Sequence, residues 1–441
     1  MSHRTPIDRL RQPFDALLGA QTTGGALLFF AAVAAMIWAN SPWAESYHHL
    51  WEQRIVFGGD GWGLDLSLHH WINDGLMAMF FFVVGLELKR EMVAGALSRP
   101  RDAMLPIAAA IGGMAVPAAI YLWHNPAGAA HAGWGIPMAT DIAFALGLMA
   151  LLGKRVPVAL KIFLTTLAVA DDLGAVVVIA LFYTSNISLV SLALGAGVLA
   201  IMLLGNRLGV RSPWFYAFFG IGGLWTCFLM SGVHATIAGV LAAFTIPAIP
   251  KVDEEVFVRR MRLFLIGFEG KDTPDKGIRS SEQMHDLERM SRLTEYASTP
   301  LQQLEHALHP LVTFLVLPLF ALANAGVELP DDALGALIEP VALGVALGLL
   351  LGKPIGVLLT SFIMVRFAGA RLGEGVNWSH MIGAGLLAGI GFTMSLFVNE
   401  LAFDDQLLRQ EAKLGVLSAS LLAGILGYIW LMRTARRRHG R

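Results

Sequence analysis

The apolar positions of the chain fall into long runs that are separated by shorter polar segments. Each run holds roughly 20 residues with few charges, the length that a helix needs to cross a lipid bilayer. The pattern therefore predicts an all-α membrane protein with about twelve transmembrane helices. They are expected near residues 20–40, 71–97, 103–123, 134–151, 157–182, 188–205, 214–230, 232–249, 309–327, 339–365, 378–402 and 413–432.

Two polar segments interrupt this pattern. Residues 41–70 contain two short β-type runs around a Gly-rich turn, which indicates a hairpin at 51–66. The hairpin is either part of a solvated loop or an edge that pairs with a second subunit, because an isolated hairpin is only marginally stable. Residues 251–308 are charged, and helical spacing in their second half favours a helical appendage over a flexible linker.

Composition narrows the class of protein. Hydrophobic residues make up 56% of the 441 residues and charged residues 15%, against about 25% charged in soluble domains. We therefore expect a single polytopic membrane domain over 1–441, with the lipid bilayer as its surroundings. Cys227 is the single cysteine, so the chain forms no internal disulfide. No basic module with aromatic residues indicates nucleic acid as a partner, and no motif indicates a cofactor.

The basic residues predict the orientation of the chain, because Lys and Arg are enriched in cytoplasmic loops. Connections after even-numbered spans carry most of them, whereas connections after odd-numbered spans carry Arg54, Arg409 and little else. Both ends of the chain are also basic. We therefore expect both termini in the cytoplasm and an even number of spans. The basic residues behind this prediction are Arg4, Arg9, Arg11, Arg99, Arg101, Arg155, Arg207, Arg211, Arg366, Arg371, Arg433, Arg436, Arg437, Arg438 and Arg441.

Two adjacent carboxylates, Asp171 and Asp172, stand in the middle of the apolar run 157–182. An ionised Asp at the centre of a membrane helix costs about 2.5–3.5 kcal/mol on insertion scales. Such a residue therefore indicates a functional site, where the group faces a wet cavity, has a partner or is protonated. Because burial disfavours the charged form of a carboxyl group, one buried carboxylate can bind either a proton or a hard cation such as sodium.

Three further features lie at mid-membrane depth. Pro137 and the pair Thr140-Asp141 interrupt the run 134–151, glycines punctuate 383–391, and Lys353 places a cation in the run 339–365. Glycine and proline in membrane helices commonly serve close packing or kinks, but an intramembrane Asp or Lys seldom does.

The interruptions occupy corresponding positions in two segments. Residues 103–182 and 339–432 each contain three predicted spans, and the middle span of each is interrupted. Interrupted helices in corresponding halves are typical of transporters with inverted-topology repeats, where they mark the substrate site.

Five segments of the chain resemble the NhaA-type sodium/proton antiporters. The resemblance runs from about residue 15 to 433. The segments read ATDIAFALG at 139–147, VPVALKIFL at 156–164, DDLGA at 171–175, SGVHAT at 231–236 and GIGFTMS at 389–395.

This resemblance implies a fold and an activity. It implies twelve helices, of which the fourth and eleventh are broken and cross at the midplane. It implies a secondary transporter, not an enzyme, which exchanges cytoplasmic sodium, and also lithium, for external protons with net movement of charge. The implied location is the bacterial inner membrane, the implied role is sodium and pH homeostasis, and the implied homodimer forms through the hairpin at 51–66.

The resemblance also implies roles for single residues. Asp172 is expected to be the main ligand of the transported sodium, with Asp171 beside it and an oxygen from Thr140. Lys353 is expected to pair with Asp171. Asp141 and Lys353 have the charges needed to neutralise the ends of broken helices.

A second group of residues is expected at the cytoplasmic side. The resemblance links Glu87, Arg90, Glu91, Glu305 and His306 to activation by pH, since histidine titrates in the physiological range. The alternative is that they are solvated charges at helix ends.

Two other classes of protein remain as alternatives. An intramembrane aspartyl protease needs two carboxylates around one water, normally from different helices, which the adjacent Asp171 and Asp172 fit badly. A sodium-coupled symporter of an organic solute would need a further polar cluster in the membrane.

Overall fold

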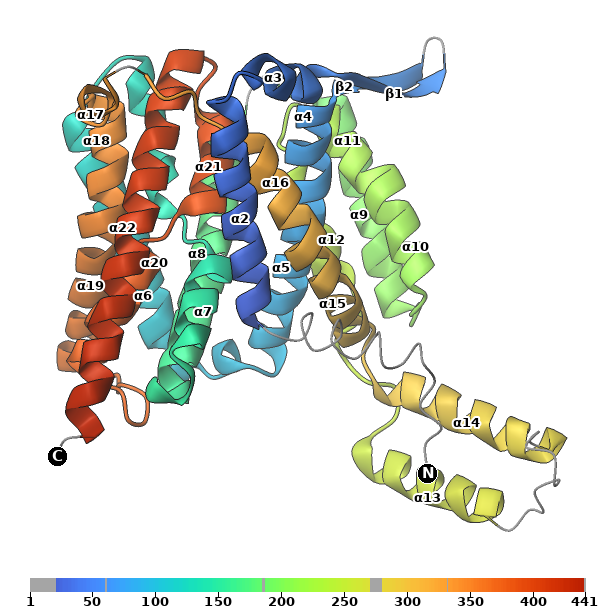
Figure 1. The fold of residues 1–441 in the computed structure, drawn as a ribbon. Coiled ribbons are helices and arrows are strands. Elements are labelled where there is room, and N and C mark those ends of the chain that lie inside the picture. The colour runs from blue at the N-terminus through green and yellow to red at the C-terminus, as the bar shows by residue number, and fades with distance from the viewer. Residues whose placement is uncertain (1–20, 60–61, 185–186, 270–279, 331, 440–441) are drawn as a thin grey trace.

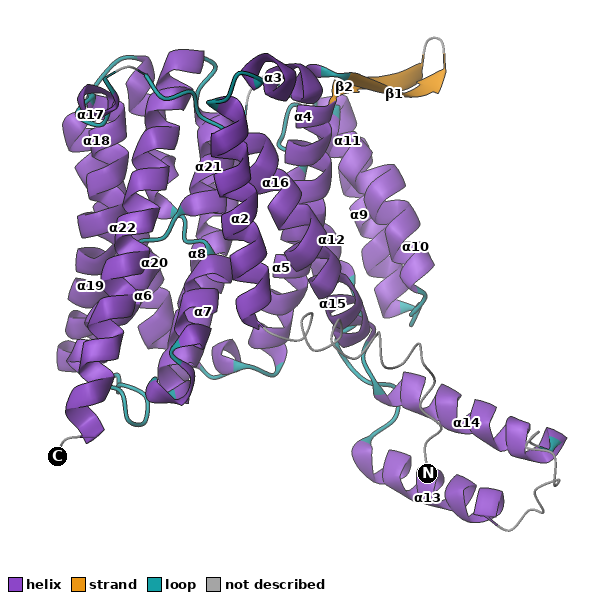
Figure 2. Ribbon diagram, viewed as in Figure 1, coloured by secondary structure: helices purple, strands orange, loops and turns teal. Residues whose placement is uncertain are grey.

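The structure is a computed structural model that describes residues 21–439 except 60–61, 185–186, 270–279 and 331. Most helices stand side by side in one bundle, and a pair of helices projects from one end of it (Figure 1). The strands in the described residues form one hairpin at the opposite end (Figure 2). The basic residues of the predicted N-terminus, Arg4, Arg9 and Arg11, lie outside the described residues.

The described helices range in length from 3 to 34 residues. The first half of the chain contains α2 (Gln21–Ala39), α3 (Ala44–Glu52), α4 (Leu68–His70), α5 (Met77–Val93), α6 (Pro100–His124), α7 (Ile142–Leu151), α8 (Val158–Phe182), α9 (Leu189–Arg207), α10 (Pro213–Ala217), α11 (Thr226–Leu229) and α12 (Thr236–Thr245). The second half contains α13 (Glu254–Glu269), α14 (Ser281–Ala297), α15 (Pro300–Leu311), α16 (Leu317–Asn324), α17 (Ala333–Ala336), α18 (Pro340–Leu347), α19 (Lys353–Phe367), α20 (Trp378–Ala388), α21 (Phe392–Ala402) and α22 (Gln406–His439).

Short stretches of wider or tighter helix connect several of these elements. The wider π-type turns are η1 (Trp71–Leu76), η5 (Phe218–Trp225), η6 (Val312–Val316) and η7 (Gly348–Gly352), and the tighter 3-10 turns are η2 (Ala96–Ser98), η3 (Ala129–Met138) and η4 (Gly153–Arg155). The strands β1 (Arg54–Gly59) and β2 (Trp62–Ser67) pair antiparallel, with Arg54 opposite Ser67.

Within the described residues, eight helical segments are long and apolar enough to cross a membrane, so the chain is a multi-pass membrane protein. These segments are Leu68–Val93, Pro100–His124, Ala129–Leu151, Val158–Phe182, Leu189–Arg207, Pro300–Asn324, Pro340–Phe367 and Gln406–Ala435. Two bent pairs of helices are also long and apolar enough when each pair is taken together, α2 with α3 (bent by 114°) and α20 with α21 (bent by 44°). Two shorter apolar helices cover Pro213–Leu229 and Thr236–Thr245.

Several helices extend beyond their apolar windows, because polar residues continue a helix outside the apolar layer. The helix expected at 309–327 begins at Pro300, and the helix expected at 413–432 covers Gln406–His439. The start at Pro300 has a local cause. The Thr299 hydroxyl accepts a hydrogen bond from Gln302 N (3.2 Å), and proline suits the first helical turn.

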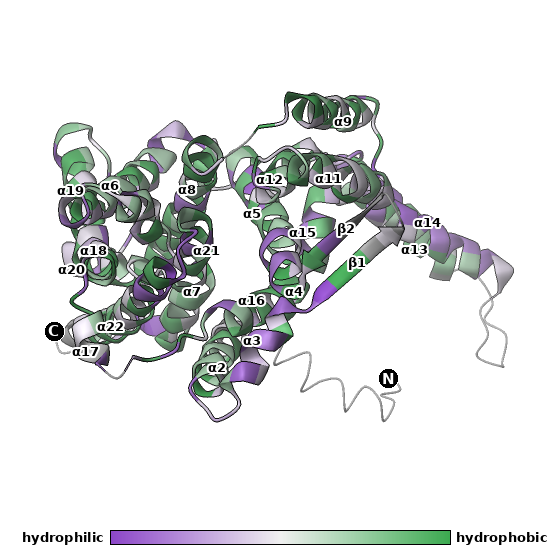
Figure 3. Ribbon diagram, turned by 90° about the horizontal axis from the view of Figure 1, so that it is seen from above, coloured by the Kyte–Doolittle hydropathy of each residue, from purple (hydrophilic) through white to green (hydrophobic). Residues whose placement is uncertain are grey.

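Seen from above, the bundle divides into two groups of helices (Figure 3). One group contains α6, α18, α19, α20 and α22, and the other contains α5, α9, α12 and α15, with α8 and α21 close to the boundary. Very close backbone contacts, which are common between membrane helices, occur in both groups. A Cβ at Gly356 of α19 would collide with the Gly112 carbonyl of α6, and one at Gly239 of α12 would collide with the Ala78 carbonyl of α5.

Candidate functional site

Helix α8 brings two carboxylates into the centre of the bundle. Asp171 and Asp172 are 0% and 1% exposed, and the helix around them is continuous and apolar over Val158–Phe182. Because α8 has no break here, the surroundings of the two side chains come from neighbouring elements.

Two interrupted segments lie beside α8. The turn η3 ends at Met138 and α7 begins at Ile142, while α20 ends at Ala388 and α21 begins at Phe392. Both interruptions lie about half way along the bundle, where loop segments separate the helices (Figure 2). Their backbones are in contact, since Asp141 N donates a hydrogen bond to Ile390 O (2.6 Å).

Asp141 lies at the beginning of two helices. Its Oδ1 accepts a hydrogen bond from Phe144 N (2.9 Å), which caps α7. Its Oδ2 accepts from Thr393 N (3.1 Å) and from the Thr393 hydroxyl (2.5 Å) at the start of α21. Helix N-termini carry partial positive charge and free N–H groups. The carboxylate of Asp141 therefore accepts hydrogen bonds from free N–H groups at two helix N-termini at once. Both of its oxygens are hydrogen-bonded to groups of the protein itself.

Lys353 pairs with Asp171. Its Nζ lies 2.5 Å from Asp171 Oδ2 and also donates to the carbonyl of Met138, the last residue of η3. The Thr140 hydroxyl lies 2.7 Å from the same Asp171 oxygen and 2.9 Å from the Ala388 carbonyl at the end of α20. A hydroxyl has one proton, so Thr140 can donate to only one of these acceptors and retains lone pairs for another ligand.

Asp172 has surroundings of a different kind. Both of its carboxylate oxygens, and Oδ1 of Asp171, are buried and accept no hydrogen bond from any residue in the described part of the chain. A buried polar atom without a hydrogen-bond partner costs free energy, so binding a proton or a cation would stabilise these oxygens. The centre contains three carboxylates, those of Asp141, Asp171 and Asp172, and one cation, Lys353. The chemistry that follows is reversible binding of hard cations or protons by oxygen.

A second polar group lies toward the end of the bundle from which α13 and α14 project. Arg90 Nη1 lies 2.5 Å from Glu305 Oε1, and its Nη2 lies 3.0 Å from Glu91 Oε1 and 3.8 Å from Glu87 Oε1. The structure thus brings four of the five predicted pH-sensing residues together. The fifth, His306, is exposed on α15 next to Glu305.

A cavity of about 200 Å³ lies between α5, α7 and α8 on this same side. Its lining includes Glu91, Lys161, Thr165 and Thr166. Glu91 therefore belongs both to the Arg90 cluster and to the wall of this cavity, which is also lined by α8, the helix that carries the aspartates.

Sequence reasoning missed several groups of the site. Thr393, which contacts Asp141, and the backbone carbonyls of Met138 and Ala388 take part in the centre through contacts between distant segments. Thr393 could have been found from its place directly after the glycine-rich interruption. The two carbonyls carry no signal of residue type.

The fold and the central carboxylates define a multi-pass membrane protein with titratable groups inside its bundle. A family model described as Na+/H+ antiporter 1 matches residues 15–431, and the chain belongs to this family. A relative from Oleidesulfovibrio alaskensis, named Na(+)/H(+) antiporter NhaA, is 51% identical over 435 residues, which cover 98% of this chain and 96% of the relative. A relative of the same name from Acidithiobacillus ferrooxidans is 48% identical over 431 residues, covering 97% and 98%.

Proposed function

We propose that this protein exchanges sodium ions for protons across a membrane. The observation that carries the proposal is the unpartnered, buried carboxylate of Asp172 beside the Asp171–Lys353 pair. The names of the relatives, which are Na(+)/H(+) antiporters, support the same activity. The proposed ligands of the transported sodium are Asp172, Asp171 and Thr140, and lithium, with the same charge and hard character, is a second substrate.

Competition for the same oxygens couples the two ions. A carboxylate that holds a proton cannot bind sodium strongly, and one that holds sodium has released its proton. Sodium therefore binds on the cytoplasmic side as protons leave, and protons displace it on the other side. Because Asp171 and Asp172 are neighbours, their titrations are coupled, and the pair releases about two protons for each sodium.

Lys353 has two partners in this cycle. Its ammonium holds Asp171 while that carboxylate is ionised, and protonation of Asp171 breaks the pair. Its bond to the Met138 carbonyl keeps it at the end of η3. Asp141 is tied to two helix N-termini, so we propose that it holds the interrupted segments together without binding the ion.

The proposed fold has twelve passes and two inverted repeats over 103–182 and 339–432. Support comes from adding α2, the bent pair α20–α21 and the two shorter apolar helices to the eight long segments. The η3–α7 interruption lies in the middle of the first repeat and the α20–α21 interruption in the middle of the second. In the proposed fold these two broken helices cross at the midplane.

The proposed location is the bacterial inner membrane with both termini in the cytoplasm. Helix α2 begins and α22 ends at the end of the bundle from which α13 and α14 project (Figure 1). Lys154 and Arg155 also lie between helices at that end. The cavity next to Glu91 is then the cytoplasmic entrance, and the cluster of Glu87, Arg90, Glu91 and Glu305, with His306, is the proposed site of pH activation. One arginine shared by three carboxylates rearranges when any of them is protonated.

The hairpin supports a proposal about assembly. Strands β1 and β2 pair only with each other among the described residues and project sideways from the bundle (Figure 1). A two-stranded hairpin is marginal alone and leaves unpaired backbone groups at its edges. We propose that the hairpin at 51–66 pairs with that of a second copy of the chain.

Exchange by the purified protein in proteoliposomes tests the proposed function. An imposed pH gradient should collapse when sodium or lithium is added without any organic solute. If about two protons move for each sodium, an imposed membrane potential should also drive transport. A gradient that is insensitive to sodium would refute the function, and a rate indifferent to potential would refute the two-proton ratio alone.

A further inference from the structure

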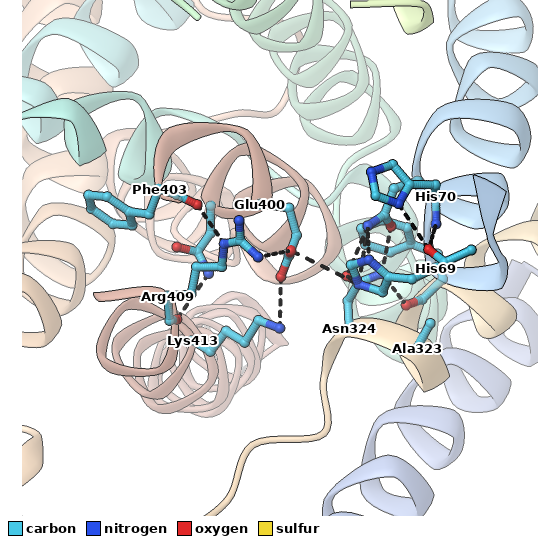
Figure 4. Close-up of polar contacts among 12 residues, drawn as sticks. His69, His70, Ala323, Asn324, Glu400, Phe403, Arg409 and Lys413 are labelled. Carbon is cyan, nitrogen blue, oxygen red and sulfur yellow. Dashed lines mark hydrogen bonds and ion pairs between the residues drawn. The ribbon is translucent and has the colours of Figure 1, made fainter. Parts of the chain in front are cut away.

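A further buried carboxylate, outside the central group, lies at the end of the bundle away from α13 and α14. Glu400, near the end of α21, has a side chain that is 7% exposed. Lys413 Nζ of α22 lies 2.8 Å from its Oε1, and Arg409 Nη1 lies 3.5 Å from its Oε2. His69 Nε2 of α4 lies 4.0 Å from the same Oε2. Figure 4 shows Glu400 between the two cations on one side and His69 on the other.

A large pocket opens directly onto this cluster. It encloses about 780 Å³ between α3 and α4 on one side and α21 and α22 on the other. Its lining includes His48, His69, His70, Glu400, Arg409 and Lys413. In the proposed orientation this pocket faces the outside, so external protons reach these groups directly.

The hydrogen bonds around His69 fix its neutral form. Asn324 Nδ2 donates to Asn73 Oδ1 (2.9 Å) and to Phe320 O (3.0 Å), which uses both amide protons. Its Oδ1 is therefore the atom that faces His69 Nε2 at 3.1 Å, so Nε2 carries the proton of the neutral ring. Asn73 Nδ2 lies 3.3 Å from both ring nitrogens, and only the unprotonated Nδ1 can accept its hydrogen bond.

Protonation changes this arrangement, because Nδ1 becomes a donor and then opposes the amide donor of Asn73. The charged and titratable groups near the ring come from its own helix and from the helices around the pocket. These groups are Tyr47, His48 and Glu52 of α3, His70 of α4, Glu400 of α21, and Arg409 and Lys413 of α22, and the pocket lining also includes Arg54, Asp65 and Asp404. Glu400 is the carboxylate that His69 approaches, at 4.0 Å, so a protonated His69 gains electrostatic stabilisation by moving toward it. A movement of about 1 Å would convert the 4.0 Å approach into a charge-assisted hydrogen bond.

We infer that His69 senses external protons, and that a protonated His69 turns from Asn73 and Asn324 toward Glu400 and closes the external mouth of the ion path. The inference rests on the proposed sodium/proton exchange for its effect on transport. Helices α4, η1 and α16 belong to one side of this contact and α21 to the other, so the new ion pair joins the two sides of the pocket (Figure 4).

The layer below the cluster explains why this contact closes the path. Phe397 precedes Glu400 by one helical turn on α21, and Thr393, which contacts Asp141, lies one further turn along. The Phe397 ring centroid lies 5.4 Å from that of Phe81 of α5 and 6.3 Å from that of Phe320 of α16. All three rings are 0% exposed. Holding α21 against α4 at Glu400 therefore keeps this apolar layer shut between the pocket and the aspartates.

A pH profile of transport tests the inference. Sodium-driven exchange by the full chain is measured in right-side-out vesicles with fixed internal pH, between external pH of about 5.5 and about 8, on either side of the ordinary histidine pKa of about 6.5. The rate of the unaltered chain, divided by that of His69→Gln, should fall severalfold as external pH falls. His70→Gln is the matched control, since His70 Nδ1 is bonded to Ser67 Oγ and not to Glu400. Its profile should match the unaltered chain, and a constant ratio for His69→Gln would overturn the inference.

Thiol labelling provides a readout that does not depend on exchange. In a Cys227→Ser chain, Ala323→Cys places one thiol in the wall of the pocket. Its labelling by a membrane-impermeant reagent should slow at low external pH. The labelling rate of the same thiol in a chain with His69→Gln corrects for titration of the thiol itself. This rate should slow less at low external pH. The charge-matched pair Glu400→Gln with Lys413→Met should also lose the extra slowing. Equal slowing in all three chains would overturn the inference even if every chain exchanges sodium normally.

Discussion

Two buried carboxylate–lysine pairs in the described part of the chain differ in their charge balance. In the centre, Asp171 and Lys353 lie 2.5 Å apart, and the neighbouring Asp172 has no hydrogen-bond partner among the described residues. At the pocket, Glu400 is contacted by Lys413 and Arg409 and is approached by His69. The centre has more carboxylates than cations, and the pocket cluster has more cations than carboxylates.

This difference decides what each cluster can bind. Oxygens without partners, in a region with surplus negative charge, can accept a cation or a proton in place of missing hydrogen bonds. The pocket cluster has one carboxylate and two cations, so it offers a metal cation no group of oxygens with surplus negative charge. The central cluster is therefore suited to carry the transported ions, and the pocket cluster is suited to hold two helices in a proton-dependent way.

The largest expected effect is the loss of exchange in Asp172→Asn. The amide keeps the shape of the side chain but can neither release a proton nor supply a charged oxygen to sodium. Exchange in proteoliposomes should become undetectable while the protein still inserts and elutes as a folded species. Glu400→Gln should retain exchange at neutral external pH, because the pocket cluster binds no transported ion. Near-normal exchange by Asp172→Asn would show that the ion site lies elsewhere.

The contrast between the clusters also shows what the sequence could predict. Asp171, Asp172 and Lys353 stand in the middle of apolar runs, where a charge is costly, so each was visible as a functional residue, whereas the role of Thr140 came from the family resemblance. The pocket cluster was not predicted. His69 falls at the end of a polar loop, and Glu400 and Lys413 fall at the ends of apolar runs, where charges are common. Their significance comes from contacts between residues that are far apart in the sequence, such as His69 and Glu400, which are 331 positions apart.

The fold was predictable to a similar extent. Apolar length located the spans, because crossing a bilayer sets a minimum length. It could not locate the ends of helices such as the one from Gln406 to His439, since polar residues continue a helix outside the apolar layer. Nor could it show that the break at 139–141 contacts the break at 389–391, which depends on the backbone bond between Asp141 and Ile390.

The second expected effect is competition between sodium and protons at the centre. Lowering the pH should weaken sodium binding, because protons occupy the same carboxylates. The apparent affinity should change by about tenfold per pH unit if one proton is displaced, and by about a hundredfold if two are. Sodium-induced proton release from the purified protein in weak buffer measures this number directly. A sodium affinity that does not change with pH would contradict the proposal that protons and sodium occupy the same carboxylates. Asp171→Asn should reduce the slope of sodium affinity against pH.

The third effect concerns stability and separates the two lysines. Lys353→Met leaves Asp171 buried without its cation, and breaking a buried pair in this way costs about 3–5 kcal/mol. Lys413→Met should cost less, because Arg409 still faces Glu400. Unfolding of the purified variants in detergent measures the loss of stability in each variant. The double variant Lys353→Met with Asp171→Asn should recover stability relative to Lys353→Met. Equal losses for the two lysines would contradict the difference in charge balance.

The smallest expected effect comes from the helical appendage, which takes part in neither cluster. Helices α13 and α14 pack against each other and project from the end of the bundle opposite the hairpin (Figure 1). Deleting residues 271–292, part of which lies outside the described residues, removes most of α14 and leaves the start of α15 at Pro300. Because Glu305 of α15 contacts Arg90, the deletion should shift the pH profile of exchange slightly while the maximal rate stays near that of the full chain. Complete loss of exchange in a folded, inserted deletion variant would show that the appendage belongs to the transport machinery, and that the two carboxylate clusters do not suffice for it.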